Sequence, residues 1–99
     1  MVKRVIWGAK ATKKYLEITL YFRENIGSQQ AADNFSDTLF EKLEVLKKYP
    51  ESGRLVKYRK TIRYVTIQKH YKIFYRTIGS TMHIAAVFDT RQDPYFSPF

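Results

Sequence analysis

Cysteine is absent from this sequence of 99 residues, and glycine and proline are scarce, with four and three copies. The lack of cysteine excludes disulfides, zinc–thiolate sites and cysteine nucleophiles. No apolar stretch approaches the roughly 18 consecutive residues that cross a bilayer. The stretch that follows Lys3 and Arg4 is also too short for the core of a signal peptide. We therefore expect a cytoplasmic protein that does not contact membranes.

Acidic residues are half as numerous as basic ones. The chain has 9 Asp and Glu against 18 Lys and Arg, which gives a formal net charge of +9. Four basic residues lie close together in the second half: Arg54, Lys57, Arg59 and Lys60. Such a cluster favours a polyanionic partner, which can be nucleic acid, the ribosome or an acidic protein segment. The alternative is a basic surface that only faces solvent.

Hydrophobic residues make up 44% of the chain and aromatic residues 16%, which argues against disorder. The length suits one small hydrophobic core. No repeat, low-complexity segment or linker divides the sequence. We expect a single domain over residues 1–99.

Two helices are predicted in the first half. Apolar residues at helical spacing run over Thr12–Glu24, with Thr12 as the N-cap. The stretch Asn25–Gly27 is a stop signal. Ser28 then caps a second helix that runs to about Tyr49, and Pro50 ends it.

Strands are predicted on either side of the helices. A short strand covers Lys3–Ala9, and an antiparallel meander covers Ile62–Ile67, Tyr71–Ile78 and Met82–Phe88. The order β-α-α-β-β-β predicts an α+β domain. In this domain a helical hairpin packs on one face of a mainly antiparallel four-stranded sheet.

Strict alternation predicts which residues of each strand share a face. In the middle strand it separates Tyr71, Ile73 and Tyr75 from Lys72, Phe74 and Arg76. In the last strand it separates Met82, Ile84, Ala86 and Phe88 from His83, Ala85, Val87 and Asp89. Both faces contain apolar residues, so we expect one face to bury against the helices. The other forms a partly apolar, partly basic surface.

Several short motifs, in their order and spacing, resemble the RelE/ParE superfamily, the toxin halves of bacterial type II toxin–antitoxin pairs. They are the turn Tyr49–Arg54, the strands Thr61–Val65 and Tyr71–Arg76, and the closing segment Val87–Pro94. The similarity covers nearly the whole chain and includes the first strand with Trp7. The resemblance implies a plasmid-stabilisation type of toxin with a cognate acidic antitoxin.

The superfamily has two activities on one fold, so the fold alone does not decide between them. One branch poisons DNA gyrase, and the other cuts mRNA on the ribosome. The cutting reaction needs a base for the ribose 2′-hydroxyl, cations for the charge on phosphorus and an acid for the leaving oxygen. The ending Asp89–Pro94 is more similar to the ParE branch, because Pro94 stands where the ribonucleases continue toward a late acid or base.

The resemblance also assigns candidate residues. Arg63 and Arg91 match arginines of the ribonuclease branch and are the catalytic candidates, while Tyr95 lies near the place of a late aromatic residue. His70 lies in a predicted loop and is a further candidate base. Each arginine can instead pair with an acidic residue, Asp89 or Asp93, at the edge of the sheet. Candidates for binding the target are Arg54, Lys57, Arg59, Lys60, Lys69 and Tyr71.

Three functions therefore stay open. A toxin that binds gyrase is favoured, a ribosome-dependent mRNA endonuclease is the alternative, and a non-catalytic nucleic-acid-binding domain is the third. We expect no metal, because no set of His, Asp and Glu has ligand spacing. We expect no other cofactor, since the glycines are scattered and form no phosphate-binding loop.

Overall fold

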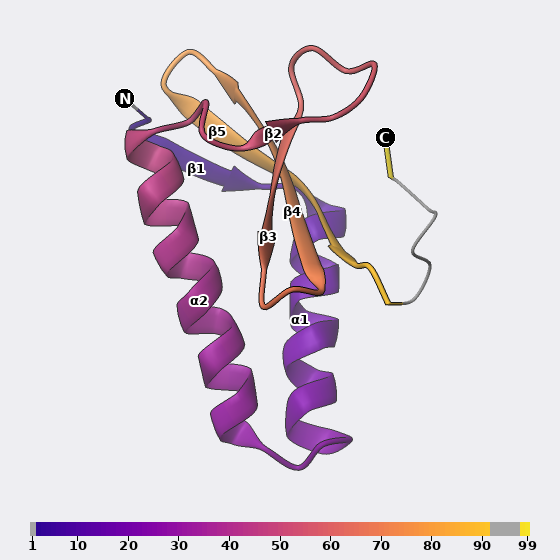
Figure 1. The fold of residues 1–99 in the computed structure, drawn as a ribbon. Helices are drawn as coiled ribbons and strands as arrows, with labels where there is room; N and C mark the ends of the chain where they lie inside the picture. The colour runs from indigo at the N-terminus through magenta and orange to yellow at the C-terminus, as the bar shows by residue number, and fades with distance from the viewer. Residues whose placement is uncertain (1, 92–97) are drawn as a thin grey trace.

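The computed structural model describes residues 2–91 and 98–99 of the chain. Its elements are β1 (Arg4–Trp7), α1 (Ala9–Glu24), α2 (Gln29–Lys48), β2 (Arg54–Leu55), β3 (Arg63–Ile67), β4 (Tyr71–Ile78) and β5 (Thr81–Asp89). The strands form one sheet in the order β1-β5-β4-β3-β2, with β1 parallel to β5 and all other neighbours antiparallel. Figure 1 shows α1 and α2 as a hairpin that extends past the end of the sheet. The predicted α+β class is confirmed.

The sheet has five strands, where four were predicted. The additional strand, β2, is two residues long and pairs Arg54 with Tyr64 and Leu55 with Arg63. Two residues are too few to show an alternating pattern in a sequence. The turn before this strand is attached to β3 and β4, as described below.

α1 begins at Ala9, about one turn before the predicted start. Its N-cap is Gly8, in an extended conformation with φ −66° and ψ 156°. Thr12 lies inside the first turn, where its Oγ1 donates a hydrogen bond to the carbonyl oxygen of Gly8 at 3.0 Å. A threonine inside a helix can bond the preceding turn in this way. The prediction of Thr12 as the cap was therefore wrong.

The ends of α2 follow local signals in the sequence. Ser28 is the N-cap, and its Oγ accepts a hydrogen bond from the backbone N–H of Ala31 at 3.0 Å. Gly27 precedes it with φ 71°, a left-handed conformation that glycine adopts without strain. The helix ends at Lys48, shortly before Pro50, which cannot continue it. The prediction for α2 is confirmed.

No described helix is long and apolar enough to cross a membrane.

The hydrophobic core lies between the helices and one face of the sheet. On α2 the core residues are Phe35, Leu39, Leu43 and Leu46, spaced three or four positions apart and at most 4% exposed. On the sheet they are Ile67, Tyr71, Ile73, Tyr75, Met82, Ile84 and Val87. The ring of Phe35 meets the ring of Tyr71 edge to face at 4.8 Å between centroids. We call the sheet face that carries these residues the inner face.

A β-bulge in β5 changes the predicted faces of the last strand. Phe74 pairs with Ala86 and Tyr75 with Ile84, which leaves Ala85 as an extra residue. After one extra residue the side chains of a strand change sides. Val87 is therefore buried on the inner face, 5% exposed, although strict alternation placed it opposite Ile84. That part of the face prediction was wrong.

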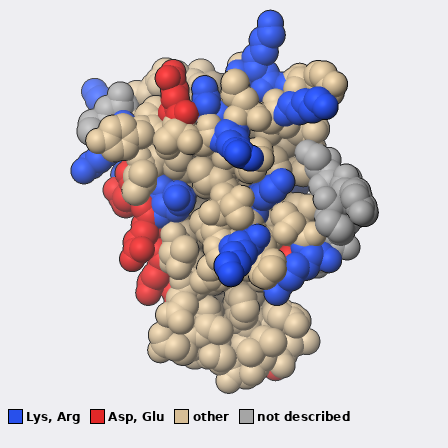
Figure 2. Space-filling view, in the orientation of Figure 1, with Lys and Arg blue, Asp and Glu red and all other residues tan. Residues whose placement is uncertain are grey.

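The outer face of the sheet points away from the helices. It carries Tyr64 and Phe74, whose ring centroids are 5.6 Å apart, together with Lys72 and the cross-strand pair Arg76 and His83. In Figure 1, β3 and β4 lie in front of α1. In the same view, Figure 2 shows Lys and Arg spread over the upper and central surface, whereas most Asp and Glu follow the side of α2. On the face seen in Figure 2, the basic side chains therefore lie mainly over the sheet.

Candidate functional site

Arg63, at the start of β3, holds the turn that precedes β2. Its Nη1 donates hydrogen bonds to the carbonyl oxygen of Glu51 at 3.0 Å and to that of Gly53 at 2.8 Å. The sequence suggested an acidic side chain as the structural partner, but the observed acceptors are two backbone carbonyls. Arg63 therefore attaches the turn over residues 50–53 to the sheet.

Tyr75 holds the same turn from within the core. Its ring is fully buried, and its hydroxyl donates to the carbonyl oxygen of Pro50 at 2.7 Å and accepts from the N–H of Gly53 at 3.0 Å. Burial raises the pKa of Tyr75, although the Gly53 hydrogen bond and the Arg63 charge act in the opposite direction. The turn is thus fixed to two neighbouring strands, and the basic residues that follow it begin from a fixed point.

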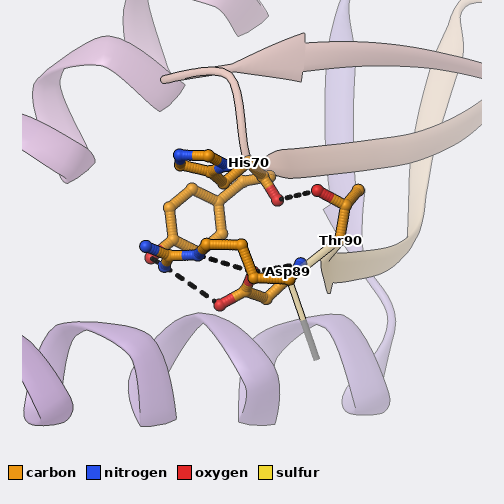
Figure 3. A network of polar contacts seen from close by, with 5 residues as sticks. His70, Asp89 and Thr90 are labelled. Atoms are coloured by element: carbon orange, nitrogen blue, oxygen red, sulfur yellow. Dashed lines mark hydrogen bonds and ion pairs between the residues drawn. The ribbon is translucent and has the colours of Figure 1, made fainter. Parts of the chain in front are cut away.

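Arg91, just after β5, is held by Asp89 and Tyr71. Its Nε donates to Oδ1 of Asp89 and its Nη2 to Oδ2, both at 3.1 Å, and its backbone N–H donates to Oδ1 at 2.9 Å. The same Nη2 donates to the hydroxyl of Tyr71 at 2.8 Å. Figure 3 shows this network beside α1, with the hydrogen bond from Thr90 to the carbonyl oxygen of His70 next to it. The ion pair with Asp89 is one of the two roles expected for Arg91.

Charge in this network is set by burial and by Arg91 together. Burial alone raises the pKa of Asp89, but its hydrogen bonds with Arg91 outweigh burial and bring the pKa below its ordinary value. The hydrogen bond to Asp89 raises the pKa of Arg91 in turn. Burial raises the pKa of Tyr71 against the opposing effect of Arg91. At neutral pH, Asp89 is an anion and Tyr71 a neutral phenol.

A hollow of 440 Å³ lies next to this network. Its lining residues are Lys14, Glu17, Ile18, Tyr21, Tyr71, Asp89 and Arg91. Two of them are cationic and two anionic, so the hollow has no excess charge of one sign. This balance gives it little preference for a phosphate.

The two catalytic candidates lie at different places on the sheet. Arg63 pairs with Tyr75, whereas Arg91 is bonded to Tyr71, and these tyrosines are four residues apart in β4. Four residues of a strand span about 13 Å. Both arginines have donors engaged by groups of the protein itself.

The candidate binding residues divide into an exposed set and a buried one. Arg54, Lys57, Arg59, Lys60 and Lys69 are exposed. The first four belong to the segment 54–60, which we call the basic loop. Within it Tyr58 is 90% exposed with φ 65°, and the Nζ of Lys57 lies 5.2 Å from the centroid of its ring. Tyr71 is only 3% exposed, so it belongs to the core rather than to a free aromatic surface.

The remaining catalytic candidates are His70 and Tyr95. His70 is exposed in the turn between β3 and β4, where its carbonyl oxygen accepts hydrogen bonds from the N–H and Oγ1 of Thr90. Tyr95 and Asp93 lie outside the described residues. Within residues 2–91 and 98–99, no group of three or more His, Asp or Glu side chains is placed to hold a metal ion.

Comparison with known proteins identifies the family. Residues 5–94 match the model of the ParE toxin of type II toxin–antitoxin systems, parDE. The chain belongs to the ParE toxin family. A solved structure of a chromosomal ParDE TA system from P. aeruginosa is similar in fold, with a TM-score of 0.72 and 18% sequence identity. The match covers 90% of this chain and 96% of that one. No curated protein sequence matches.

Alternation predicted the outer face of this ParE-family toxin as a partly apolar, partly basic surface, but its residues were not among the candidate site residues. It brings Lys72 and Arg76 to the same surface as Tyr64 and Phe74, with the Nζ of Lys72 4.6 Å from the centroid of Tyr64. Alternation in β4 already separated Lys72 and Arg76 from the core tyrosines. That signal identified the face but not which aromatic residues of other strands would join it.

Proposed function

We propose that this ParE-family toxin inhibits growth by binding DNA gyrase, and that it does not cut RNA. The observation that carries the proposal is the state of Arg63 and Arg91. An RNA-cutting site needs cations that converge on one phosphate to stabilise its growing charge. Arg63 donates to the turn carbonyls, and Arg91 is neutralised by Asp89. These contacts favour structural roles for both.

The positive charge of the basic loop supports inhibition by binding rather than by a chemical reaction. The basic loop is exposed and is positioned by the turn that Arg63 and Tyr75 hold. A fixed cationic loop can complement an acidic surface of a protein without any reactive group. The action we propose is therefore an inhibitory contact with gyrase in the cytoplasm.

An acidic antitoxin is the second partner in this proposal. The helical hairpin exposes Leu16, Leu20 and Phe40, each between 46% and 55% accessible. An acidic amphipathic segment that orders on binding would cover such apolar residues and neutralise part of the net charge of +9. Its association should be fast and should weaken as the salt concentration rises.

Two parallel assays test the proposal. The purified toxin is added to a gyrase supercoiling reaction and to a translating system with ribosomes and a defined mRNA. We expect loss of supercoiling with intact mRNA. Cuts in the mRNA that depend on ribosomes and disappear in Arg91→Ala would establish the endonuclease instead. Retained supercoiling and intact mRNA, together with binding of RNA or DNA alone, would favour the nucleic-acid-binding alternative.

The charge-reversed variant Lys57→Glu adds a control for surface recognition. It changes an exposed side chain of the basic loop and leaves the turn intact, so the protein should fold normally. We expect weaker inhibition of gyrase from it. The matched variant Lys13→Glu, on the exposed surface of α1, should inhibit as the unmodified toxin does.

A further inference from the structure

Tyr58, in the basic loop, has a backbone conformation that tyrosine rarely adopts. The N–H of Arg59 donates to the carbonyl oxygen of Val56 at 3.0 Å, which closes a four-residue turn with Tyr58 in its third position. The φ angle of Tyr58 is 65°, whereas that of Lys57 is not positive. This combination matches a type II turn, in which the third residue is ordinarily glycine or asparagine. A residue with a larger side chain is strained there.

The side chain of Tyr58 contributes little to the packing of the protein itself. It is 90% exposed, whereas the rings of Tyr71 and Tyr75 belong to the core. The Nζ of Lys57 lies 5.2 Å from the centroid of the Tyr58 ring, and a contact of this kind is weak at an exposed site. Strained residues of this kind are concentrated at functional sites. A tyrosine that is strained and exposed therefore indicates a role outside the fold.

The strained turn stands on a rigid support. Val56, at its start, is 8% exposed, and its N–H donates to the carbonyl oxygen of Ile62 at 2.9 Å. The turn over residues 50–53, which precedes β2, is held by Arg63 and Tyr75. Figure 1 shows the segment between β2 and β3 at the end of the sheet opposite to the tip of the helical hairpin. A ring that is held in place before binding loses less entropy when it is bound.

The charge around Tyr58 is of one sign. Lys57 precedes it, Arg59 and Lys60 follow it, and all three are exposed. No Asp or Glu occurs in the chain between Glu51 and Asp89. Tyrosine and arginine are among the residues that most often contribute the binding energy of protein interfaces. An aromatic ring among cations complements a pocket that is apolar inside and acidic at its rim.

We propose that Tyr58 is the anchor residue of the toxin, the side chain that enters an apolar pocket with an acidic rim on its protein target. Lys57, Arg59 and Lys60 pair with carboxylates of this rim. The proposal rests on the target-binding role proposed above for the basic loop. It adds the residue that determines affinity and the chemistry of the pocket, and it explains why tyrosine stands where a turn ordinarily has glycine.

The presence of one ring favours a protein over a single-stranded nucleic acid. Proteins that bind single strands stack successive bases on several aromatic side chains. Tyr58 is the only aromatic residue in the basic loop. The ammonium group of Lys57 lies over its ring and hinders stacking of a base on that face.

Three variants separate the ring of Tyr58 from the strain of its backbone. Tyr58→Gly removes both, and Tyr58→Phe keeps both and removes only the hydroxyl. Tyr49→Ala is the control, because it removes another exposed ring, 64% accessible, outside the basic loop. In urea denaturation, we expect an unchanged or higher midpoint for Tyr58→Gly. The reason is that relief of the strain offsets the flexibility that glycine adds to the unfolded chain.

Inhibition is measured in two ways, by growth arrest after induced expression at matched protein levels and by the gyrase supercoiling reaction. Truncation of an anchor residue weakens binding strongly, so we expect Tyr58→Gly to need about tenfold more toxin, or more, for the same inhibition. Tyr58→Phe and Tyr49→Ala should inhibit as the unmodified toxin does.

The outcomes separate this proposal from the choice of gyrase as target. Growth arrest and gyrase inhibition by Tyr58→Gly equal to those of the unmodified toxin would overturn the anchor role and leave gyrase as the target. Growth arrest that is lost in Tyr58→Gly, with a supercoiling reaction that the unmodified toxin does not inhibit, would support the anchor and overturn gyrase. An unmodified toxin that inhibits neither would overturn both.

Two further results would contradict the anchor role. A urea midpoint for Tyr58→Gly lower by more than about 0.5 M would show that the ring stabilises the fold. Binding of a single-stranded oligonucleotide by the unmodified toxin, lost in Tyr58→Gly and retained in Tyr49→Ala, would assign the ring to nucleic acid instead.

Discussion

Tyr75→Phe tests how the turn before the basic loop is held. The substitution keeps the buried ring and removes only the hydroxyl, which donates to Pro50 O and accepts from Gly53 N–H. The Gly53 N–H would then be buried without its acceptor, since Gly53 is itself buried. An unsatisfied buried group costs about 1–3 kcal/mol, so we expect the free energy of unfolding to fall by about 2 kcal/mol.

Urea denaturation measures this change. With a slope of about 2 kcal/mol per molar urea, the midpoint should fall by about 1 M while the slope stays the same. Tyr58→Phe is the matched control, because Tyr58 is 90% exposed and its loss of a hydroxyl should leave the midpoint unchanged. A decrease of less than about 0.5 kcal/mol for Tyr75→Phe would contradict the role assigned to its hydroxyl.

Three further predictions concern the same fold. Gly53→Ala should unfold at lower urea than the unmodified toxin, because the new Cβ would collide with the hydroxyl of Tyr75; a double variant with Tyr75→Phe should lose less than the two single effects added together. Asp89→Asn should lower stability at pH 7 by about 1 kcal/mol, since the partner Arg91 is half exposed. Because the folded pKa of Asp89 is lowered, its stabilisation is complete above the ordinary pKa of about 3.9 and is lost as the pH falls through the folded pKa. Thermal melts from pH 7 to pH 2 should therefore show a smaller acid-side loss for Asp89→Asn, and an unchanged loss would contradict the pairing. Leu39→Ala, at a fully buried site, should cost about 2–5 kcal/mol by the same urea assay, and a smaller cost would place Leu39 outside the core.

Features decided within a few residues were predictable from the sequence. Ser28 and Pro50 define α2 because a cap and a helix breaker act on their own neighbours. The bulge at Ala85 was not predictable, because it depends on how β5 aligns with Phe74 in another strand. Register of this kind is a property of pairs of strands, and alternation within one strand contains no information on it.

In the candidate site, too, local features were predictable and contacts between distant segments were not. The sequence identified Arg63 and Arg91 as charged residues at strand ends, and the structure has them at those places. It did not indicate that Arg63 would bond the carbonyl oxygens of Glu51 and Gly53, because backbone acceptors have no signature in a sequence. Likewise, no local pattern connects Phe99 to Phe74, since the contact joins segments far apart in the chain.

The pairing of β1 with β5 has a consequence for the synthesis of the toxin. Arg4 lies opposite Thr81, so the first strand has to wait until 77 further residues have been made (81 minus 4). At about 5–20 residues per second, this takes about 4–15 s. During that time Val5 and Trp7, which later pack against the core, have no strand to pair with. Each newly made molecule therefore lacks its finished sheet until β5 has been translated.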